Sequence, residues 1–355
     1  MIVEVGKYAL INAKLRARIS NILSDDFFTS LIKSPSLTEM LNMFRNSTFA
    51  KLAAIYEETG DLKMVELALY KSEATIFIDI EKYLPKEAIS VSRSYAMGYE
   101  IENLKNTLRL FFDRTFRKRT IDNSIHYLMR EQLLHTIPFD AIINASSFDE
   151  IVRLLSATPY KNIVQQRIPE VNRLQSLFPL TSALDRFYYQ QLLDRVAELS
   201  VRDRSIAHRL IGIEIDLQNI NWIIRFRSYY NLSFDDVSDL IIPGGFTVKG
   251  PALRDIYQSQ QLSSPLESML KKNYPGIAVL LAKPGHDQNA RLQMIEHILE
   301  QIMLVEVQRI MRGYPFTIGI VLAYYILKRL EIKRIRTVLN AGFYHISKER
   351  TASLL

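Results

Sequence analysis

The chain repeats itself at a spacing of domain size, and this repeat constrains the fold more than any other feature. A block that begins at Phe28 reappears at Phe139 with an ungapped offset of 111 residues (139 − 28). The matched positions are Phe28, Ile32, Ser36, Leu37, Glu39, Met40, Leu41, Phe44, Ser47, Phe49 and Leu52 in the first copy, and Phe139, Ile143, Ser147, Phe148, Glu150, Ile151, Val152, Leu155, Thr158, Tyr160 and Ile163 in the second. Such a spacing is typical of repeated domains and not of a solenoid.

A second repeated element lies further along each copy. Residues 100–109 match residues 216–225 at an offset of 116 (216 − 100), and residues 331–340 form a third, weaker copy. Apolar side chains recur at i, i+3 and i+7 in each copy, which predicts one buried face of a helix. The third copy exchanges two polar positions, because Arg334 and Asn340 stand where the other copies have Asn and Arg.

The repeats predict an all-α protein made of three similar helical domains, at residues 1–115, 116–235 and 236–355. Only 12 glycines occur in 355 residues, which favours long helices because glycine is costly inside them. A third copy of the first block is faint, at residues 263–275. Three such domains can close around an axis in a pseudo-threefold arrangement and leave a central hollow that accepts the end of a helical shaft, or they can stack in a line.

Two serines predict where helices restart inside the first block. Ser36 and Ser147 each stand three residues before a glutamate, Glu39 and Glu150, which is the pattern of a capping box. In this motif the serine side chain accepts from the amide three residues on, and the glutamate reaches back to the serine amide. We therefore expect a short helix, a break and a newly capped helix in both copies.

Composition and motifs argue against an enzyme. The chain has no cysteine, which excludes disulfides and thiolate metal sites, and its six histidines lack the close helical spacing of metal ligands. Neither a nucleophile motif nor a phosphate-binding loop is found, so no cofactor is expected. The net charge of +7 favours an anionic partner, although many soluble proteins are mildly basic. The most apolar stretch, residues 315–327, is too short to span a bilayer and predicts a buried helix, so any membrane link is expected to be peripheral.

Several charged residues are candidates for function or for local support. Arg109 and Arg225 recur at matching positions, so they form either ion pairs within their own domains or a basic ring that faces an acidic partner. The basic run at residues 114–119 is a candidate for nucleic acid or anionic lipid. Pairs of acid and arginine three residues apart, at 306 and 309 and at 331 and 334, are interpreted as exposed helix support.

Three segments resemble the signatures of one known family, the C subunits of the V/A-type ATPases, whose eukaryotic homologues are named d. They are residues 8–17, residues 214–220 and residues 315–336, so the resemblance is spread from one end of the chain to the other. The resemblance implies a funnel-like body of three similar helical domains. It also implies a non-catalytic rotor subunit on the cytoplasmic face of the membrane that transmits torque between ATP chemistry and proton or sodium movement.

The resemblance implies two sets of partners. These are the central shaft, made of a long coiled-coil stalk subunit and its small companion, and the proteolipid ring of the membrane sector; nucleic acid is not expected. We assign partner binding to Arg109, Arg225, Arg334 and Arg336. The alternative is a helical scaffold or nucleic-acid-binding protein that uses its basic surface and shows strongly salt-dependent binding to DNA or RNA. A third hypothesis, an unrecognised enzyme, requires an acid and a base that converge in a pocket.

Overall fold

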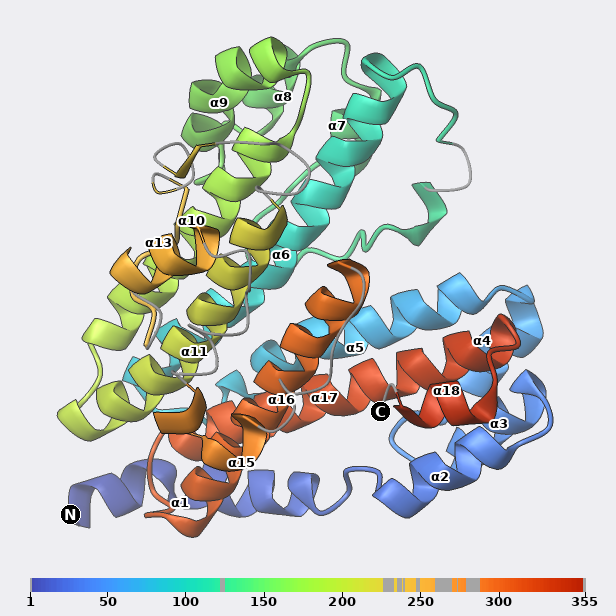
Figure 1. The fold of residues 1–355 in the computed structure, drawn as a ribbon, viewed down its shortest axis with the longest axis vertical. Coiled ribbons are helices and arrows are strands. Elements are labelled where there is room, and N and C mark those ends of the chain that lie inside the picture. The colour runs from blue at the N-terminus through green and yellow to red at the C-terminus, as the bar shows by residue number, and fades with distance from the viewer. Residues whose placement is uncertain are drawn as a thin grey trace.

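The computed structural model describes residues 2–121, 125–225, 233, 234, 238, 240–246, 250–258, 270–272, 274–278 and 288–353. Every regular element in these ranges is a helix, so the predicted all-α class is confirmed (Figure 1). Six of the described helices have 20 or more residues, and they form three hairpins: α5 (Leu62–Glu81) with α6 (Lys86–Thr115), α10 (Phe178–Ala197) with α11 (Val201–Arg225), and α16 (Gln288–Arg312) with α17 (Gly319–Phe343).

The other helices are shorter. They are α1 (Ile2–Ile19), α2 (Asp25–Lys33), α3 (Leu37–Met43), α4 (Lys51–Thr59), α7 (Phe139–Asn144), α8 (Phe148–Leu154), α9 (Lys161–Leu174), α13 (Gly250–Gln258), α15 (Pro275–Ala278) and α18 (Lys348–Ser353), with 3-10 turns at Phe44–Asn46 and Ile125–Tyr127. Those between the hairpins, such as α7, α8 and α9, lie beside the outer parts of the long helices (Figure 1).

The predicted serine caps are present, but neither glutamate accepts from the amide of its capping serine, so the reciprocal half of the capping box is absent in both copies. Ser36 Oγ accepts from the amide of Glu39 at 3.2 Å, and Ser147 Oγ accepts from the amide of Glu150 at 3.3 Å. The carboxylate of Glu150 accepts from the amide and hydroxyl of Ser146, each at 2.7 Å, instead of from the amide of the capping serine. The helix therefore starts where the motif predicts, but its first turn is held from one residue further back.

The six long helices form a closed cycle of contacts. Within the hairpins, α5 packs on α6, α10 on α11 and α16 on α17. Between hairpins, α6 packs on α10, α11 on α16, and α17 returns to α5 (Figure 1). In each hairpin, one helix therefore packs against the preceding hairpin and the other against the next hairpin. The third hairpin packs against the first, which closes the cycle.

The buried cores follow this cycle and not the order of the chain. One core is formed by side chains of α6, α7, α8, α9 and α10. Another is formed by side chains of α2, α3, α4 and α5 together with the second half of α17. In the latter, Ile332 and Leu339 pack with Phe28 and Leu41. A third and larger core contains residues of α1 and of all three hairpins. The division at residues 115 and 235 stays a prediction. Helix α17 supplies part of the core that is otherwise formed by α2 through α5.

Equivalent hydrogen bonds support the repeat at the level of single residues. Glu100 on α6 accepts from the amide of Leu134 at 3.0 Å, and Glu331 on α17 accepts from the amide of Leu23 at 2.8 Å. Leu23 and Leu134 are separated by the same 111 residues as the repeated blocks (134 − 23). An equivalent buried carboxylate thus binds the loop before each of the two blocks. The carboxylate that binds the loop before the Phe28 block comes from residues 331–340, the third copy of the second repeated element.

Two buried asparagines repeat another contact. The side chain of Asn103 donates to the carbonyl of Met129 at 2.6 Å and accepts from its amide at 3.3 Å. Asn219, the matching residue of α11, makes the same pair of bonds with Ile242, both at 2.8 Å. Each asparagine satisfies both backbone groups of a loop residue, which a buried loop requires.

Residues 319–327 of the most apolar stretch form the first half of α17 and all but Leu327 are buried, as predicted. Residues 315–318 form the turn that precedes the helix. No helix within the described part of the chain is long and apolar enough to cross a membrane.

Candidate functional site: a charged central hollow

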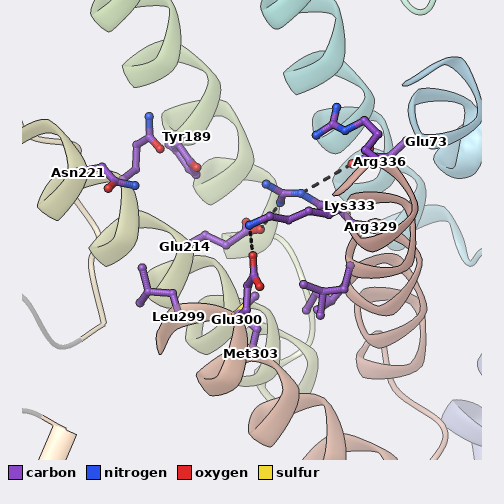
Figure 2. Close-up of a pocket in the computed structure, with 13 residues that line it drawn as sticks. Glu73, Tyr189, Glu214, Asn221, Leu299, Glu300, Met303, Arg329, Lys333 and Arg336 are labelled. Atoms are coloured by element: carbon purple, nitrogen blue, oxygen red, sulfur yellow. Dashed lines mark hydrogen bonds and ion pairs between the residues drawn. The ribbon is translucent and has the colours of Figure 1, made fainter. Parts of the chain in front are cut away.

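Three adjoining pockets lie between the hairpins, and we call them together the central hollow. Their volumes are about 360, 340 and 310 Å³, and Gln218 lines all three. The first is bounded by α5, α10, α11, α16 and α17 (Figure 2). The other two extend it along α6 and α10. The hollow is therefore shared by all six long helices.

Three helices turn corresponding faces toward the hollow. The lining residues are Glu102, Lys105 and Arg109 on α6, Glu214, Gln218 and Asn221 on α11, and Arg329, Lys333 and Arg336 on α17. Spacings of three and four residues keep each row on one side of its helix. Positions 102, 218 and 333 correspond in the repeat, as do positions 105, 221 and 336. Sequence analysis missed most of these residues, although the basic row of α17 was visible as residues spaced by four and three.

Ion pairs cross the hollow between helices. Arg329 lies 2.8 Å from Glu214 of α11 and 3.7 Å from Glu73 of α5, and Lys333 pairs with Glu300 of α16 (Figure 2). Burial raises the pKa of the Glu214 carboxyl, and Arg329 opposes that shift. The three hairpins are thus connected by charge across the hollow as well as by packing.

A second cluster of charge lies where α6 meets α10. The Lys105 ammonium lies 2.7 Å from Glu102 and 2.8 Å from Asp185. Burial lowers the pKa of this ammonium, but the two carboxylates outweigh that effect and the net shift is upward. Burial also raises the pKa of Asp185, against the influence of Lys105. Lys105 is therefore charged at neutral pH and already has two acidic partners.

Tyrosines form the inner wall beside these charges. The hydroxyl of Tyr99 donates to Glu73 at 2.5 Å and lies 3.0 Å from the hydroxyl of Tyr325. Burial raises the pKa of both phenols, which keeps them neutral. The ring of Tyr95 stacks on Phe77 at 4.9 Å and contacts Tyr325 at 4.8 Å, so helices α5, α6 and α17 meet through aromatic side chains.

The four arginines assigned to partner binding lie in different places. Arg109 lines the hollow, is half exposed, lies 3.5 Å from Glu102 and hydrogen-bonds Asn106. Arg336 lines two of the pockets and has no hydrogen bond or ion pair among the described residues. The side chain of Arg225 lies outside the described part of the structure.

Arg334 lies away from the hollow. Its guanidinium is 2.8 Å from Asp25 and 3.9 Å from the centre of the Phe28 ring. It occupies the repeat position of Asn103 and Asn219, on the side of the helix that faces the short helices. In the third copy, the asparagine that bonds both backbone groups of a loop residue is therefore replaced by Arg334, whose guanidinium lies over the ring of Phe28.

The arginines of the basic run at residues 114–119 form hydrogen bonds or ion pairs with other residues of the chain. Arg114 donates to the carbonyls of Ile143 and Ala145, the former at 3.0 Å. Arg117 lies 3.0 Å from Asp113, and Arg119 lies 3.9 Å from it. These contacts neutralise part of the charge that a nucleic-acid-binding surface needs.

The interpretation of Glu306 and Glu331 as exposed helix support is wrong. Glu306 is only 1% exposed and accepts from Arg209 at 2.6 and 2.8 Å and from Tyr274 at 2.9 Å, in addition to Arg309. Burial raises the pKa of Glu306, but the bonds from Arg209 and Tyr274 outweigh it, so the pKa is lowered.

Glu331 is 2% exposed and pairs with Lys328 at 2.6 Å, so its partner is not Arg334. Both acids were misread because spacing along a helix does not reveal which face a neighbouring helix covers.

No group of three histidine or acidic side chains in the described ranges is arranged to hold a metal ion.

The hollow is lined by equal numbers of acidic and basic side chains. Its acids are Glu73, Glu102, Asp113, Asp185, Glu214 and Glu300, and its cations are Lys105, Arg109, Arg117, Arg329, Lys333 and Arg336. Such an arrangement is suited to holding helices and a polar protein surface.

Comparison with known proteins gives one consistent family. The family model described as "ATP synthase (C/AC39) subunit" matches residues 11–354. The C subunit of the A-type ATP synthase of Methanosphaera stadtmanae is 25% identical over 340 residues, which are 95% of this chain and 84% of that protein. The same subunit of Methanocaldococcus jannaschii is 21% identical over 100% of this chain and 88% of its own length, and that of Thermococcus onnurineus is 22% identical over 98% and 90%.

Proposed function

This chain belongs to the ATP synthase (C/AC39) subunit family, and we propose that it is the central-stalk subunit that joins the rotating shaft to the membrane ring of a V/A-type ATPase. In this role it transmits torque and carries out no chemistry itself. The shaft is the long coiled-coil stalk subunit with its small companion, and the ring is the proteolipid ring, which moves protons or sodium ions. The protein lies on the cytoplasmic face of the membrane as a peripheral component.

The closed cycle of six long helices around the charged hollow carries this proposal. A part that transmits torque has to resist being pulled apart, and a cycle distributes the load over every helix contact. Each hairpin belongs to two neighbouring groups of helices, so no group can turn without moving the next. We propose that these groups are the three similar domains of a pseudo-threefold, funnel-like body.

The lining of the hollow suits the end of a protein shaft. Equal numbers of acidic and basic side chains provide electrostatic complementarity for a polar partner without favouring a polyanion. Ion pairs such as Arg329 with Glu214 already tie the walls together, which lowers the cost of ordering the site when a partner binds.

Affinity capture from detergent-solubilised membranes tests the proposal. The tagged chain is the bait, and mass spectrometry identifies the proteins it retains. We expect the long stalk subunit, its companion and the proteolipid. Recovery of nucleic acid or of unrelated soluble proteins, without any other part of an ATPase, would contradict the proposal and favour a helical scaffold.

A further inference from the structure

The three corresponding positions 105, 221 and 336 differ in the charge that they offer to a partner. We propose that a carboxylate at the end of the inserted shaft pairs with Arg336, and that this single contact selects one of three rotational settings of the shaft in the hollow. The inference rests on the proposed function, because it assumes that a shaft enters the hollow.

Arg336 differs from the other cations of the inner rows of α6 and α17. Arg329 pairs with Glu214, and Lys333 pairs with Glu300. Lys105 has two acids beside it, and Arg109 lies 3.5 Å from Glu102. Arg336 is half buried, lines two pockets and has no hydrogen-bond or ion-pair partner in the described ranges. A guanidinium in this position presents a planar pair of donors that matches a carboxylate.

The other two positions offer much less to a carboxylate. Lys105 is 7% exposed, and Glu102 and Asp185 already neutralise it. Asn221 carries no charge, and its Oδ1 is a buried acceptor without a hydrogen-bond partner among the described residues. A shaft turned by one third would place its carboxylate against the neutral amide of Asn221 or the neutralised Lys105.

The difference between positions makes the cycle of similar helices asymmetric. A hollow with three equal walls binds a shaft equally well in three settings, because specificity is a difference between affinities. Among the described residues, a cation without an acidic partner stands at only one of the three positions, and this difference removes that equality. The partner chemistry is therefore an acidic side chain on the helical end of the shaft, opposite α17.

Binding of the purified shaft, the long stalk subunit with its companion, to the immobilised chain tests the contact. We expect Arg336→Ala to weaken binding about tenfold, equivalent to about 1.4 kcal/mol, and to reduce the salt dependence of the affinity. Arg336→Lys should restore part of the loss. Lys51→Ala, at an exposed cation of α4, should bind as the unmodified chain does. Thermal unfolding of each variant checks that it is folded.

The absence of cysteine allows the rotational setting to be measured directly. A single cysteine placed at Lys82, Glu198 or Arg312, beside the three hairpin turns, carries a spin label, and a second label sits on the shaft. We expect one distance from each site in the unmodified complex and several distances when Arg336→Asn makes α17 match Asn221 of α11.

Two outcomes separate the inference from the function on which it rests. If the shaft binds the unmodified chain, but Arg336→Ala and Arg336→Asn leave the affinity and the single distances unchanged, the inference is wrong and the proposed function stands. If the unmodified chain does not bind the shaft, the proposed function itself is contradicted.

Discussion

Single buried amides hold the loops of this protein to its long helices. Asn103 is 2% exposed and satisfies both the amide and the carbonyl of Met129. Asn219 does the same for Ile242 at the matching place in the next repeat. The side chain has the right length to bridge one residue of backbone, so its removal leaves two buried polar groups unpaired.

We therefore expect Asn103→Ala to lower the free energy of unfolding by about 2–6 kcal/mol, since it leaves two buried groups unsatisfied and each costs about 1–3 kcal/mol. Asn106→Ala is the matched control. Asn106 is only half buried and its side chain hydrogen-bonds Arg109, so its loss should cost less than about 0.5 kcal/mol. Urea unfolding followed by circular dichroism measures both, and equal costs would show that Asn103 is not a clamp.

Glu306 connects stability to pH. Its pKa is lowered from 4.5 in the folded chain, because bonds from Arg209 and Tyr274 outweigh the effect of burial. A carboxyl with a lowered folded pKa stabilises the fold above its unfolded pKa, and this contribution is lost as the pH falls through the folded pKa. The contribution of Glu306 is therefore complete at pH 7 and declines below about pH 4.5.

Glu306→Gln should lower the free energy of unfolding at pH 7 by about 2 kcal/mol, the range of hydrogen bonds to charged groups. The difference from the unmodified chain should shrink as the pH falls from 5 to 3. Glu198→Gln, which removes an exposed pair with Arg195, is the control and should have little effect at any pH. A difference that stays constant down to pH 3 would exclude this account of Glu306.

Sequence alone predicted some residue contacts and not others. Ser36 and Ser147 were found because capping is local, within three residues. The ion pairs of Glu306 with Arg209 and of Arg329 with Glu214 were missed because their partners lie about a hundred residues away. The environment of Arg334 was missed for the same reason, since Asp25 and Phe28 belong to the opposite end of the chain.

At the scale of elements, the short helices depend on their caps. Helix α8 has seven residues, and Ser147 is its N-cap. Short helices gain little from propagation, so the first turn contributes a large part of their stability. The apolar residues Phe148 and Ile151 of this helix lie in the core that contains α6, so the cap also positions core side chains.

We expect Ser147→Ala to reduce the free energy of unfolding by about 1 kcal/mol, the usual cost of losing an N-cap. Ser147→Thr keeps the acceptor and should retain most of the stability. The same pair of substitutions at Ser36 should behave alike, because its bond to Glu39 is equivalent. Thermal unfolding of the four variants checks this, and identical unfolding of the Ala and Thr forms would argue against a role for the cap.

The helical elements were predictable because their periodicity and caps are properties of neighbouring residues. The breaks after Lys33 and Asn144 fall where the sequence indicates them. The pairing of the elements was not predictable in this way. The second half of α17 shares a core with α2 through α5, and no feature of residues 331–340 indicates that their partners begin at Phe28.

At the scale of the whole molecule, the cycle of hairpins explains why the repeat appears irregular along the chain. The carboxylate of Glu331 binds the loop before Phe28, as Glu100 binds the loop before Phe139. Residues 331–340, the third copy of the second repeated element, therefore pack with the block that begins at Phe28 and bind the loop before it. The division into three domains at residues 115 and 235 stays a prediction. In the described ranges, one core combines residues from the two ends of the chain.

The proposed coupling role is tested most directly in the assembled ATPase. ATP hydrolysis and ATP-driven ion uptake are measured in parallel on vesicles whose complexes are assembled with and without this chain. We predict that omission leaves ATP hydrolysis by the catalytic sector but abolishes ion uptake, and that adding the chain back restores uptake. Ion uptake of the same size per ATP hydrolysed in the absence of the chain would contradict the account.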